Sequence, residues 1–112
     1  MPTLFTRIIE GEIPAEIIYQ DDHVVCFRDV QPQAPVHVLI VPRQEIPGLA
    51  ELPIEGDHLH ILNAAKLIAQ QLELKNGYRL VINSGEDAGQ TVPHLHAHLL
   101  GGAKLGHFGV PE

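Results

Sequence analysis

Several features that would define a function class are scarce in this chain of 112 residues. The single cysteine, Cys26, excludes an internal disulfide or a zinc site built from thiolates, and on a predicted strand it is expected to be a small core residue. No apolar run approaches the ~18 residues of a membrane span, and the first residues lack a signal peptide's apolar stretch. With 7 basic against 14 acidic residues, nucleic acid is a poor partner, because binding it requires cations that neutralise phosphates. We therefore expect a cytoplasmic protein that binds neither membranes nor nucleic acid.

The size and the apolar content predict one compact unit. A chain of 12.3 kDa buries roughly two thirds of its unfolded surface on folding, which is enough for one hydrophobic core. Apolar residues make up 45% of the sequence, so the chain is neither disordered nor fibrous. We find no internal repeat or linker, and we expect residues 1–112 to form a single domain.

The order of the predicted elements indicates an α+β fold with a mostly antiparallel sheet. Apolar spacing and turn residues predict, in order, a short helix Thr3–Ile9, strands Ile17–Gln20, Val24–Arg28 and Val36–Val41, a long helix Asp57–Leu74, and strands Tyr78–Ile82 and His94–Leu100. Thr3 and Asp57 are expected to cap the two helices, and Gly77 marks the end of the long one.

Histidine is the residue type that stands out, with eight copies in the chain. In a strand His94–Leu100, alternate residues point to opposite faces. One face would carry His94, His96 and His98, while the apolar residues between them would pack on the core. An ordinary core strand would not carry histidine at three alternate positions.

Two kinds of chemistry fit such a row of imidazoles. A zinc site is disfavoured by distance, because the outer Cα atoms of a straight strand would lie roughly 13 Å apart, although two of the histidines with His37 could hold an ion. Catalysis needs only one imidazole at the reacting atom. His96 lies in the middle of the row and is the expected nucleophile. A second histidine would donate a proton or bind an oxyanion, and a third would orient its neighbour.

The loop before the histidines suggests what they attack. Residues 83–91 contain two glycines, which permit close backbone approach, and successive N–H groups in such turns bind anions. Neutral polar groups are supplied by Asn83, Ser84, Gln90 and Thr91. A phosphorus centre between this loop and the histidines is the simplest interpretation.

The other histidines carry weaker signals. His37 lies on an apolar strand, where a single histidine is usually a core residue. His23 and His107 lie in turn and tail contexts and are expected to be solvated. His58 and His60 lie roughly 200° apart around a helix, so these two cannot share a ligand.

The segment His94-Leu95-His96-Ala97-His98-Leu99-Leu100 resembles the His-Φ-His-Φ-His-Φ-Φ signature of the histidine triad (HIT) superfamily, where Φ is apolar. Residues 29–42, 77–83 and 101–102 are also similar to its Hint branch, the histidine triad nucleotide-binding proteins. The resemblance implies a five-stranded antiparallel sheet with one long and one short helix, and a homodimer whose sheets join.

The resemblance also implies an activity. It implies a purine nucleoside phosphoramidase that binds purine mononucleotide conjugates and releases a nucleoside monophosphate such as AMP through a nucleotidyl-histidine intermediate, with no metal or organic cofactor. His96 matches the nucleophile, His98 the histidine near the α-phosphate and leaving group, and His94 and His37 the supporting histidines. The implied nucleotide contacts are Phe5, Ile8, Phe27, Asp29, Val30, Asn83, Gly89, Gln90 and Thr91 together with His96 and His98, Asp29 being placed at the ribose hydroxyls.

This chain departs from the Hint pattern at both ends. Relatives often carry paired zinc-binding cysteines near the N-terminus, where this chain reads Thr3-Leu4-Phe5-Thr6-Arg7. Their Trp-Pro-Pro tail is replaced by residues 107–112, with Phe108 as the candidate for the tryptophan. Leaving-group preference therefore stays open.

Two other functions remain as alternatives. One is a dinucleoside polyphosphate hydrolase of the Fhit type, which would use the same chemistry on a nucleotide leaving group. The other is a nucleotide-binding adaptor with only vestigial catalysis, which the intact set of three histidines disfavours. Branches that transfer nucleotides between sugars carry glutamine in place of the third histidine, and His98 argues against them.

Overall fold

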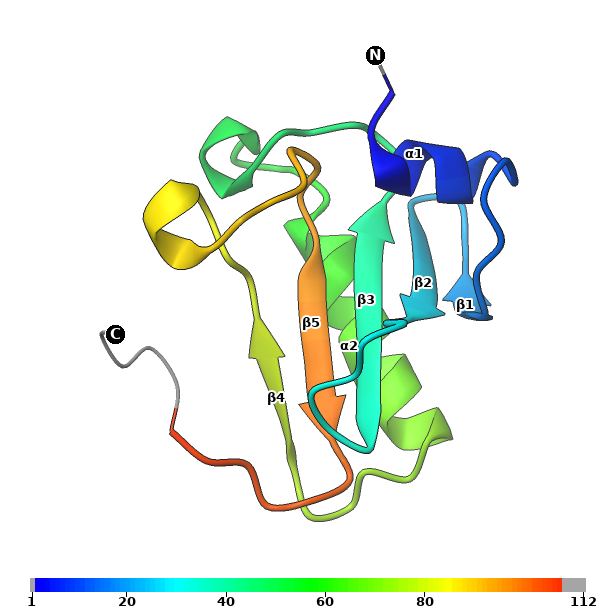
Figure 1. Ribbon diagram of the computed structural model, residues 1–112, viewed down its shortest axis with the longest axis vertical. Coiled ribbons are helices and arrows are strands. Elements are labelled where there is room, and N and C mark those ends of the chain that lie inside the picture. Colours follow the sequence, from blue (N-terminus) through cyan, green and yellow to red (C-terminus); the bar gives the residue numbers. More distant parts are fainter. Residues whose placement is uncertain (1, 108–112) are drawn as a thin grey trace.

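The structure is a computed structural model that describes residues 2–107, so Phe108 and the rest of the tail lie outside the described residues. A five-stranded sheet, in the order β1-β2-β3-β5-β4 with every neighbouring pair antiparallel, has α2 on one face and α1 on the other (Figure 1). This confirms the predicted α+β fold. In chain order the elements are α1 (Leu4–Ile9), β1 (Ile17–Gln20), β2 (Val24–Arg28), β3 (Val36–Pro42), the 3₁₀ turn η1 (Leu49–Glu51), α2 (His58–Gln71), β4 (Tyr78–Val81), the 3₁₀ turn η2 (Glu86–Ala88) and β5 (Ala97–Gly101).

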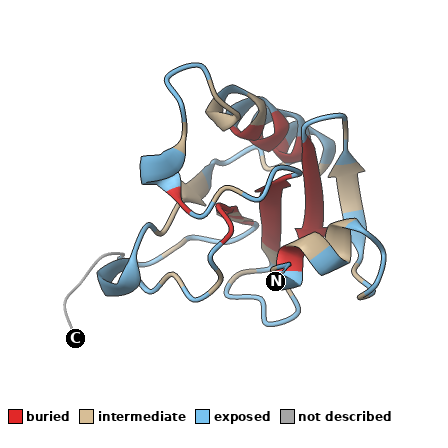
Figure 2. Ribbon diagram, turned by 90° about the horizontal axis from the view of Figure 1, so that it is seen from above, coloured by how far each residue is buried: buried red, intermediate tan, exposed pale blue. Residues whose placement is uncertain are grey.

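Strand β3 lies at the centre of the sheet and is buried on both faces. Val38 and Ile40 belong to the core that packs against α2. Leu39 and Val41, which alternate with them, belong to a second core with Phe5 of α1. Figure 2 shows the buried residues in the central strands and on the side of α2 that faces them. Continuous apolar character in this strand follows from burial on both faces, as the sequence predicts.

Helix α2 covers one face of the sheet through a stripe of apolar residues at helical spacing. The buried residues of α2 are Ile61, Ala64, Ala65, Ile68 and Ala69. Small alanines in this stripe allow the helix to pack close to the strands. Within residues 2–107, no helix combines the length and apolar character needed to cross a bilayer.

The C-terminus of α2 differs from the prediction, because the helix ends at Gln71 rather than at Leu74. The Leu74 N–H donates to the Ala69 carbonyl over 2.9 Å, and the Glu73 N–H donates to the Gln70 carbonyl over 3.1 Å. Glu73 itself adopts the left-handed conformation, with φ of 56°. These two bonds form a Schellman motif, and a glutamate occupies the position that usually carries glycine. The end signal at Gly77 therefore lies beyond the true end of the helix.

Replacing Glu73 with glycine is expected to raise the free energy of unfolding by up to about 1 kcal/mol, because glycine has no Cβ to clash in the left-handed region. Urea unfolding measures the change. The control is Gln71→Gly in the last regular turn, which should lower stability by about 1 kcal/mol. Equal losses in the two variants would contradict a strained Glu73.

Strand β5 begins at Ala97, three residues later than predicted. At the start of β5, Ala97 pairs with Ile40 of β3. Before that point the chain leaves the ladder, because the Leu95 N–H donates to the Ile46 carbonyl at 2.6 Å instead of to β3. The alternation is nevertheless as predicted, since Leu95, Ala97 and Leu99 are buried in the core under α2. His94 and His96 thus lie in the irregular segment just before the strand.

Candidate active site

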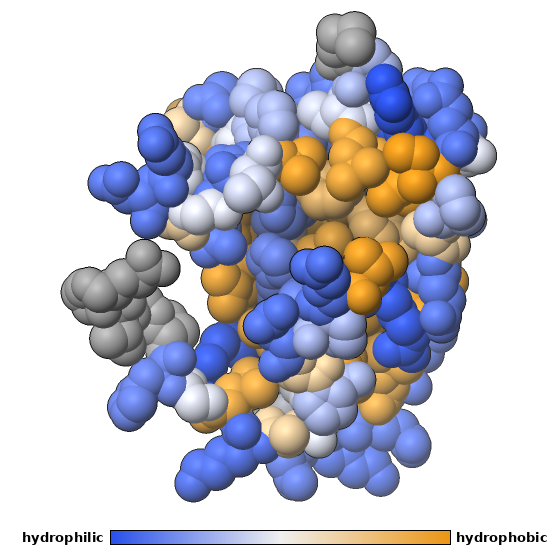
Figure 3. Space-filling view, viewed as in Figure 1, coloured by the Kyte–Doolittle hydropathy of each residue, from blue (hydrophilic) through white to orange (hydrophobic). Residues whose placement is uncertain are grey.

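A cavity of about 400 Å³ opens on the α1 side of the sheet. Its volume is in the range of sites that hold small molecules. Its walls are mainly apolar side chains from α1, from residues 13–15, and from β2 and β3, and Figure 3 shows hydrophobic side chains gathered over α1 on this face. Of the residues expected at a nucleotide site, the cavity is lined by Phe5, Ile8, Phe27, Asp29, Val30, Thr91, His96 and His98.

Three expected contacts do not line this cavity, namely Asn83, Gly89 and Gln90. The side chain of Gln90 braces its own loop, since its Oε1 accepts from the Gly85 N–H and its Nε2 donates to the carbonyls of Pro47 and Val92. Gln90 lines a neighbouring cavity of about 510 Å³, and Thr91 borders both cavities. Roles for these three residues in ligand binding stay predictions.

The hydrogen bond of His96 defines which of its nitrogens can react. Its Nδ1 lies 2.8 Å from the backbone carbonyl oxygen of His94. A carbonyl oxygen only accepts, so Nδ1 carries the proton, and in the neutral ring Nε2 keeps its lone pair. The ring packs edge-on against Phe5, with centroids 4.9 Å apart, and is 7% exposed. His96, which lines the cavity, is therefore fixed in orientation and has an unprotonated Nε2 that can act as a nucleophile.

A chain of hydrogen bonds gives His98 the opposite character. The Gln33 N–H donates to Nδ1 of His37 over 3.0 Å, so the neutral His37 ring carries its proton on Nε2. That Nε2 lies 2.9 Å from Nδ1 of His98 and donates to it, and also lies 3.4 Å from Oδ2 of Asp29. With Nδ1 accepting, neutral His98 carries its proton on Nε2. His98 thus has an N–H to donate, and its ring centroid lies 5.1 Å from that of His96.

Burial keeps the rings of His98 and His37 neutral. It lowers the pKa of His98 to about 4, with smaller contributions in the same direction from the neighbouring His96 and His37. Burial also lowers the pKa of His37, and the nearby Asp29 carboxylate only partly opposes it. Because neutral rings prevail at pH 7, the assignment of donors and acceptors holds there.

His94 is tied to the N-terminus of α1 by a network that sequence reasoning missed. Its Nε2 donates to the Pro42 carbonyl and its Nδ1 accepts from the Thr3 hydroxyl, both over 2.8 Å. The Thr3 hydroxyl also accepts the Thr6 N–H, which confirms Thr3 as the helix cap. Glu45 accepts from the Thr3 N–H and the Thr6 hydroxyl, and these bonds, the first above all, lower its pKa. In this network the hydroxyls of Thr3 and Thr6 lie in the segment where the resemblance described above would often place paired cysteines.

Replacing Thr3 with valine is expected to lower the free energy of unfolding by about 1–2 kcal/mol, because it removes both the helix cap and the hydroxyl that donates to the buried His94. Chemical denaturation measures the loss. Thr3→Ser keeps the hydroxyl and should stay close to wild type, so a Thr3→Ser loss as large as that of Thr3→Val would argue that the methyl packing matters instead.

The geometry weakens the metal alternative at the triad. Both ring nitrogens of His94 are taken by protein groups, so this ring cannot share an ion with His96. Ligand atoms of Asp29, His37 and His98 do lie within 4.8 Å of one another. The two imidazoles of that group are already joined by a hydrogen bond, which an ion would have to displace.

Comparison with known proteins shows to which family the chain belongs. The family model of the HIT domain matches residues 10–105. A HIT-like protein of Synechococcus elongatus is 54% identical over 105 residues, covering 92% of each chain. The Escherichia coli K12 protein named purine nucleoside phosphoramidase is 46% identical over 107 residues, 93% of this chain and 90% of that one. A solved HIT family hydrolase from Legionella pneumophila superposes with a TM-score of 0.87 at 42% identity, covering 92% of this chain and 95% of that one. These matches confirm the resemblance read from the histidine motif, and the chain belongs to the HIT domain family.

Proposed function

We propose that this protein is a hydrolase that cleaves the P–N bond of purine nucleoside 5′-phosphoramidates and releases the nucleoside monophosphate. The observation that carries the proposal is the pairing of a free lone pair on His96 with a free N–H on His98 at one cavity. The Escherichia coli relative named purine nucleoside phosphoramidase supports the choice of substrate.

The first step is an in-line displacement at the α-phosphorus. Nε2 of His96 forms a bond to phosphorus while the P–N bond breaks, and the departing amine takes up one proton from solution. The imidazole becomes cationic as the bond forms. Its Nδ1–H then donates more strongly to the His94 carbonyl oxygen, which stabilises the developing positive charge.

The second step returns the enzyme to its starting state. Water attacks the phosphorus of the nucleotidyl-histidine and the bond to His96 breaks. One proton of the water leaves to solution, which balances the proton used in the first step, and the other stays on the released monophosphate. Throughout, the Nε2–H of His98 donates a hydrogen bond toward the phosphoryl oxygen or the leaving group. Because its pKa is about 4, His98 acts at pH 7 as a neutral donor held by His37.

The walls of the cavity suit the nucleoside part of such a substrate. Phe5, Ile8 and Phe27 offer an apolar surface for a base. The Asp29 carboxylate, which accepts from the Gln31 N–H through Oδ1, lines the same cavity and suits ribose hydroxyls as an acceptor. Val30 is 90% exposed, so it contributes at the rim rather than deep in the pocket.

The test is AMP release from adenosine 5′-phosphoramidate in excess EDTA, with diadenosine polyphosphates assayed in parallel. Metal-independent turnover that favours the phosphoramidate supports the proposal. Faster cleavage of the dinucleotides would favour the Fhit-type alternative, and AMP binding without turnover on either substrate would favour an adaptor. Loss of activity in EDTA would revive a metal mechanism. The homodimer and the cytoplasmic location implied at the sequence level stay predictions.

A further inference from the structure

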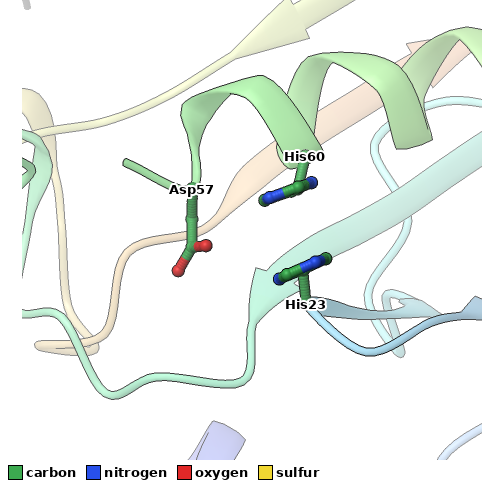
Figure 4. A group of neighbouring side chains, drawn as sticks. All are labelled: His23, Asp57 and His60. Carbon is green, nitrogen blue, oxygen red and sulfur yellow. The ribbon is translucent and has the colours of Figure 1, made fainter. Parts of the chain in front are cut away.

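Three potential metal ligands far apart in the sequence meet outside the candidate active site. His23 comes from the turn between β1 and β2, whereas Asp57 and His60 come from the start of α2 (Figure 4). The imidazoles of His23 and His60 are stacked, with centroids 3.6 Å apart and planes 3° apart. One ligand atom from each of the three residues lies within 4.8 Å of the others. His23 is exposed, as predicted, but its stacking on His60 was not expected.

The backbone holds these residues in place through contacts of its own. The His23 N–H donates to Oδ1 of Asp21 over 2.8 Å, and the His23 carbonyl accepts from the Arg43 N–H over 2.9 Å. Asp57 and His60 are three residues apart at a helix start, a spacing that places two side chains on the same side of the helix. The next residue, Ile61, is 1% exposed and fixes this turn against the sheet.

The Asp57 carboxylate is available for a ligand. Asp57 occupies the N-cap position of α2, where aspartate usually accepts a backbone N–H. Contrary to the prediction, its side chain makes no capping hydrogen bond, and its backbone is helical, with φ of −70° and ψ of −5°. Figure 4 shows the carboxylate beside the stacked rings, on the same side as one nitrogen of each ring. The residue that should cap the helix thus faces the histidines.

We propose that His23, Asp57 and His60 bind one divalent transition-metal ion of the Zn²⁺ type. Two imidazoles and a carboxylate are ligands that zinc accepts, and hard ions such as Mg²⁺ prefer all-oxygen sets. Stacked rings direct their lone pairs in parallel, so binding requires the two rings to tilt until both point at one ion. The remaining coordination position is left to water, because the site lies at the surface. The net charge of −7 favours a cation.

The site is separate from the proposed catalytic cavity, since none of the three residues lines it. An ion there ties the β1–β2 turn to the start of α2 and binds only the folded chain. Zinc is therefore expected to raise the Tm by about 5 °C at saturation and to leave the chemistry at His96 unchanged.

Isothermal titration with ZnCl₂ tests the proposal on the wild type and on His23→Asn, Asp57→Asn and His60→Gln. The matched control is His58→Gln, which removes a histidine from the same helical turn but from another side of the helix. We expect one saturable Zn²⁺ per chain in the wild type and in the control. Each of the three ligand variants should bind at least ~10-fold more weakly, since even outer partners of metal ligands cost that much.

A second readout locates the ion. Zinc should shift the amide NMR signals of residues 21–24 and 57–61 at lower concentration than those near His98, whose group with Asp29 and His37 is the competing site. Far-UV circular dichroism and Tm without zinc verify that each variant is folded. Unchanged zinc affinity in His23→Asn and His60→Gln, an equal loss in His58→Gln, first shifts near His98, or no saturable binding would each overturn the proposal.

Discussion

Replacing His96 with alanine is expected to lower kcat for AMP release from adenosine 5′-phosphoramidate by a factor of ~10³ or more, as is typical for removal of a nucleophile. The reason lies in one lone pair. Nδ1 of His96 carries its proton because it faces the His94 carbonyl oxygen, so Nε2 is the nitrogen that can attack. Affinity for AMP should persist, since the apolar walls and Asp29 remain in place.

The matched control is His58→Ala, which removes a histidine of α2 that does not line the cavity. It should keep wild-type turnover. A second measurement looks for the intermediate itself: rapid quenching with a labelled substrate should trap label on the wild type in an acid-labile, base-stable bond and none on His96→Ala. Residual activity above about a tenth of wild type in His96→Ala would show that another group attacks phosphorus.

Hydrogen bonding explains why three histidines of one motif do not share one role. His94 has both nitrogens engaged, one by the Pro42 carbonyl and one by the Thr3 hydroxyl, so it serves as a structural link to α1. His98 accepts from His37 on Nδ1 and is left with an N–H. Of the three rings, His96 is the one that lines the cavity and keeps a lone pair that no hydrogen bond of the described residues engages. The different roles assigned to the three histidines follow from the hydrogen-bond partners of their ring nitrogens and not from the residue type.

Local sequence patterns predict much of the fold and the face on which the histidines lie. Alternation along the segment from His94 placed Leu95, Ala97 and Leu99 in the core and the histidines on the other face, and branched apolar residues marked β3 as the central strand. Such features depend on neighbours within a few residues, which a sequence displays directly. The same local pattern makes His96, in the middle of the row, the expected nucleophile, and that role stays a prediction.

What the sequence could not predict depends on residues that meet only in the fold. Thr3 and His94, which are 91 positions apart, are one such pair. His37 and His98 are 61 apart; the local pattern around His37 favours a core residue, and it is the family resemblance that implies His37 as a supporting histidine. Glu45 carried no signal because an isolated glutamate in an irregular segment is ordinarily solvated. The end of α2 was missed for a different reason, since the motif that ends it has glutamate where glycine is the usual marker.

Acidification offers a test of the neutral histidines that needs no substrate. The free energy of unfolding is expected to fall as the pH drops from 7 to 5. Burial places the folded pKa of His98 at about 4, whereas an unfolded histidine titrates near 6.5. At pH values between these two pKa values, His98 is protonated in the unfolded chain and neutral in the folded chain. The unfolded state then holds more protons, so stability rises with pH and is lost as pH falls.

The size of the effect follows from the gap between the two pKa values. Each pH unit over which the unfolded histidine is protonated and the folded one is not lowers the free energy of unfolding by about 1.4 kcal/mol. Because pH 5 lies about one and a half units below the unfolded pKa, and because His98 is partly exposed, we expect His98 alone to lower it by on the order of 1–2 kcal/mol. Burial also lowers the pKa values of His37 and His94, and both act in the same direction. The stabilisation linked to the lowered pKa of Glu45 is lost only at more acidic pH, because a free glutamate is half protonated near pH 4.5.

Urea unfolding at pH 5, 6 and 7 measures this slope, and His98→Asn identifies its source. Asparagine can still accept from His37 Nε2–H but does not titrate, so the variant should lose less stability between pH 7 and 5 than the wild type. His58→Asn, which removes a histidine away from the cavity, should keep the wild-type slope. Parallel curves for the wild type and His98→Asn would mean that His98 protonates freely in the folded chain. In that case the ring could give up a proton as a cation near neutral pH, and the neutral donor assigned to it in the proposed mechanism would be wrong.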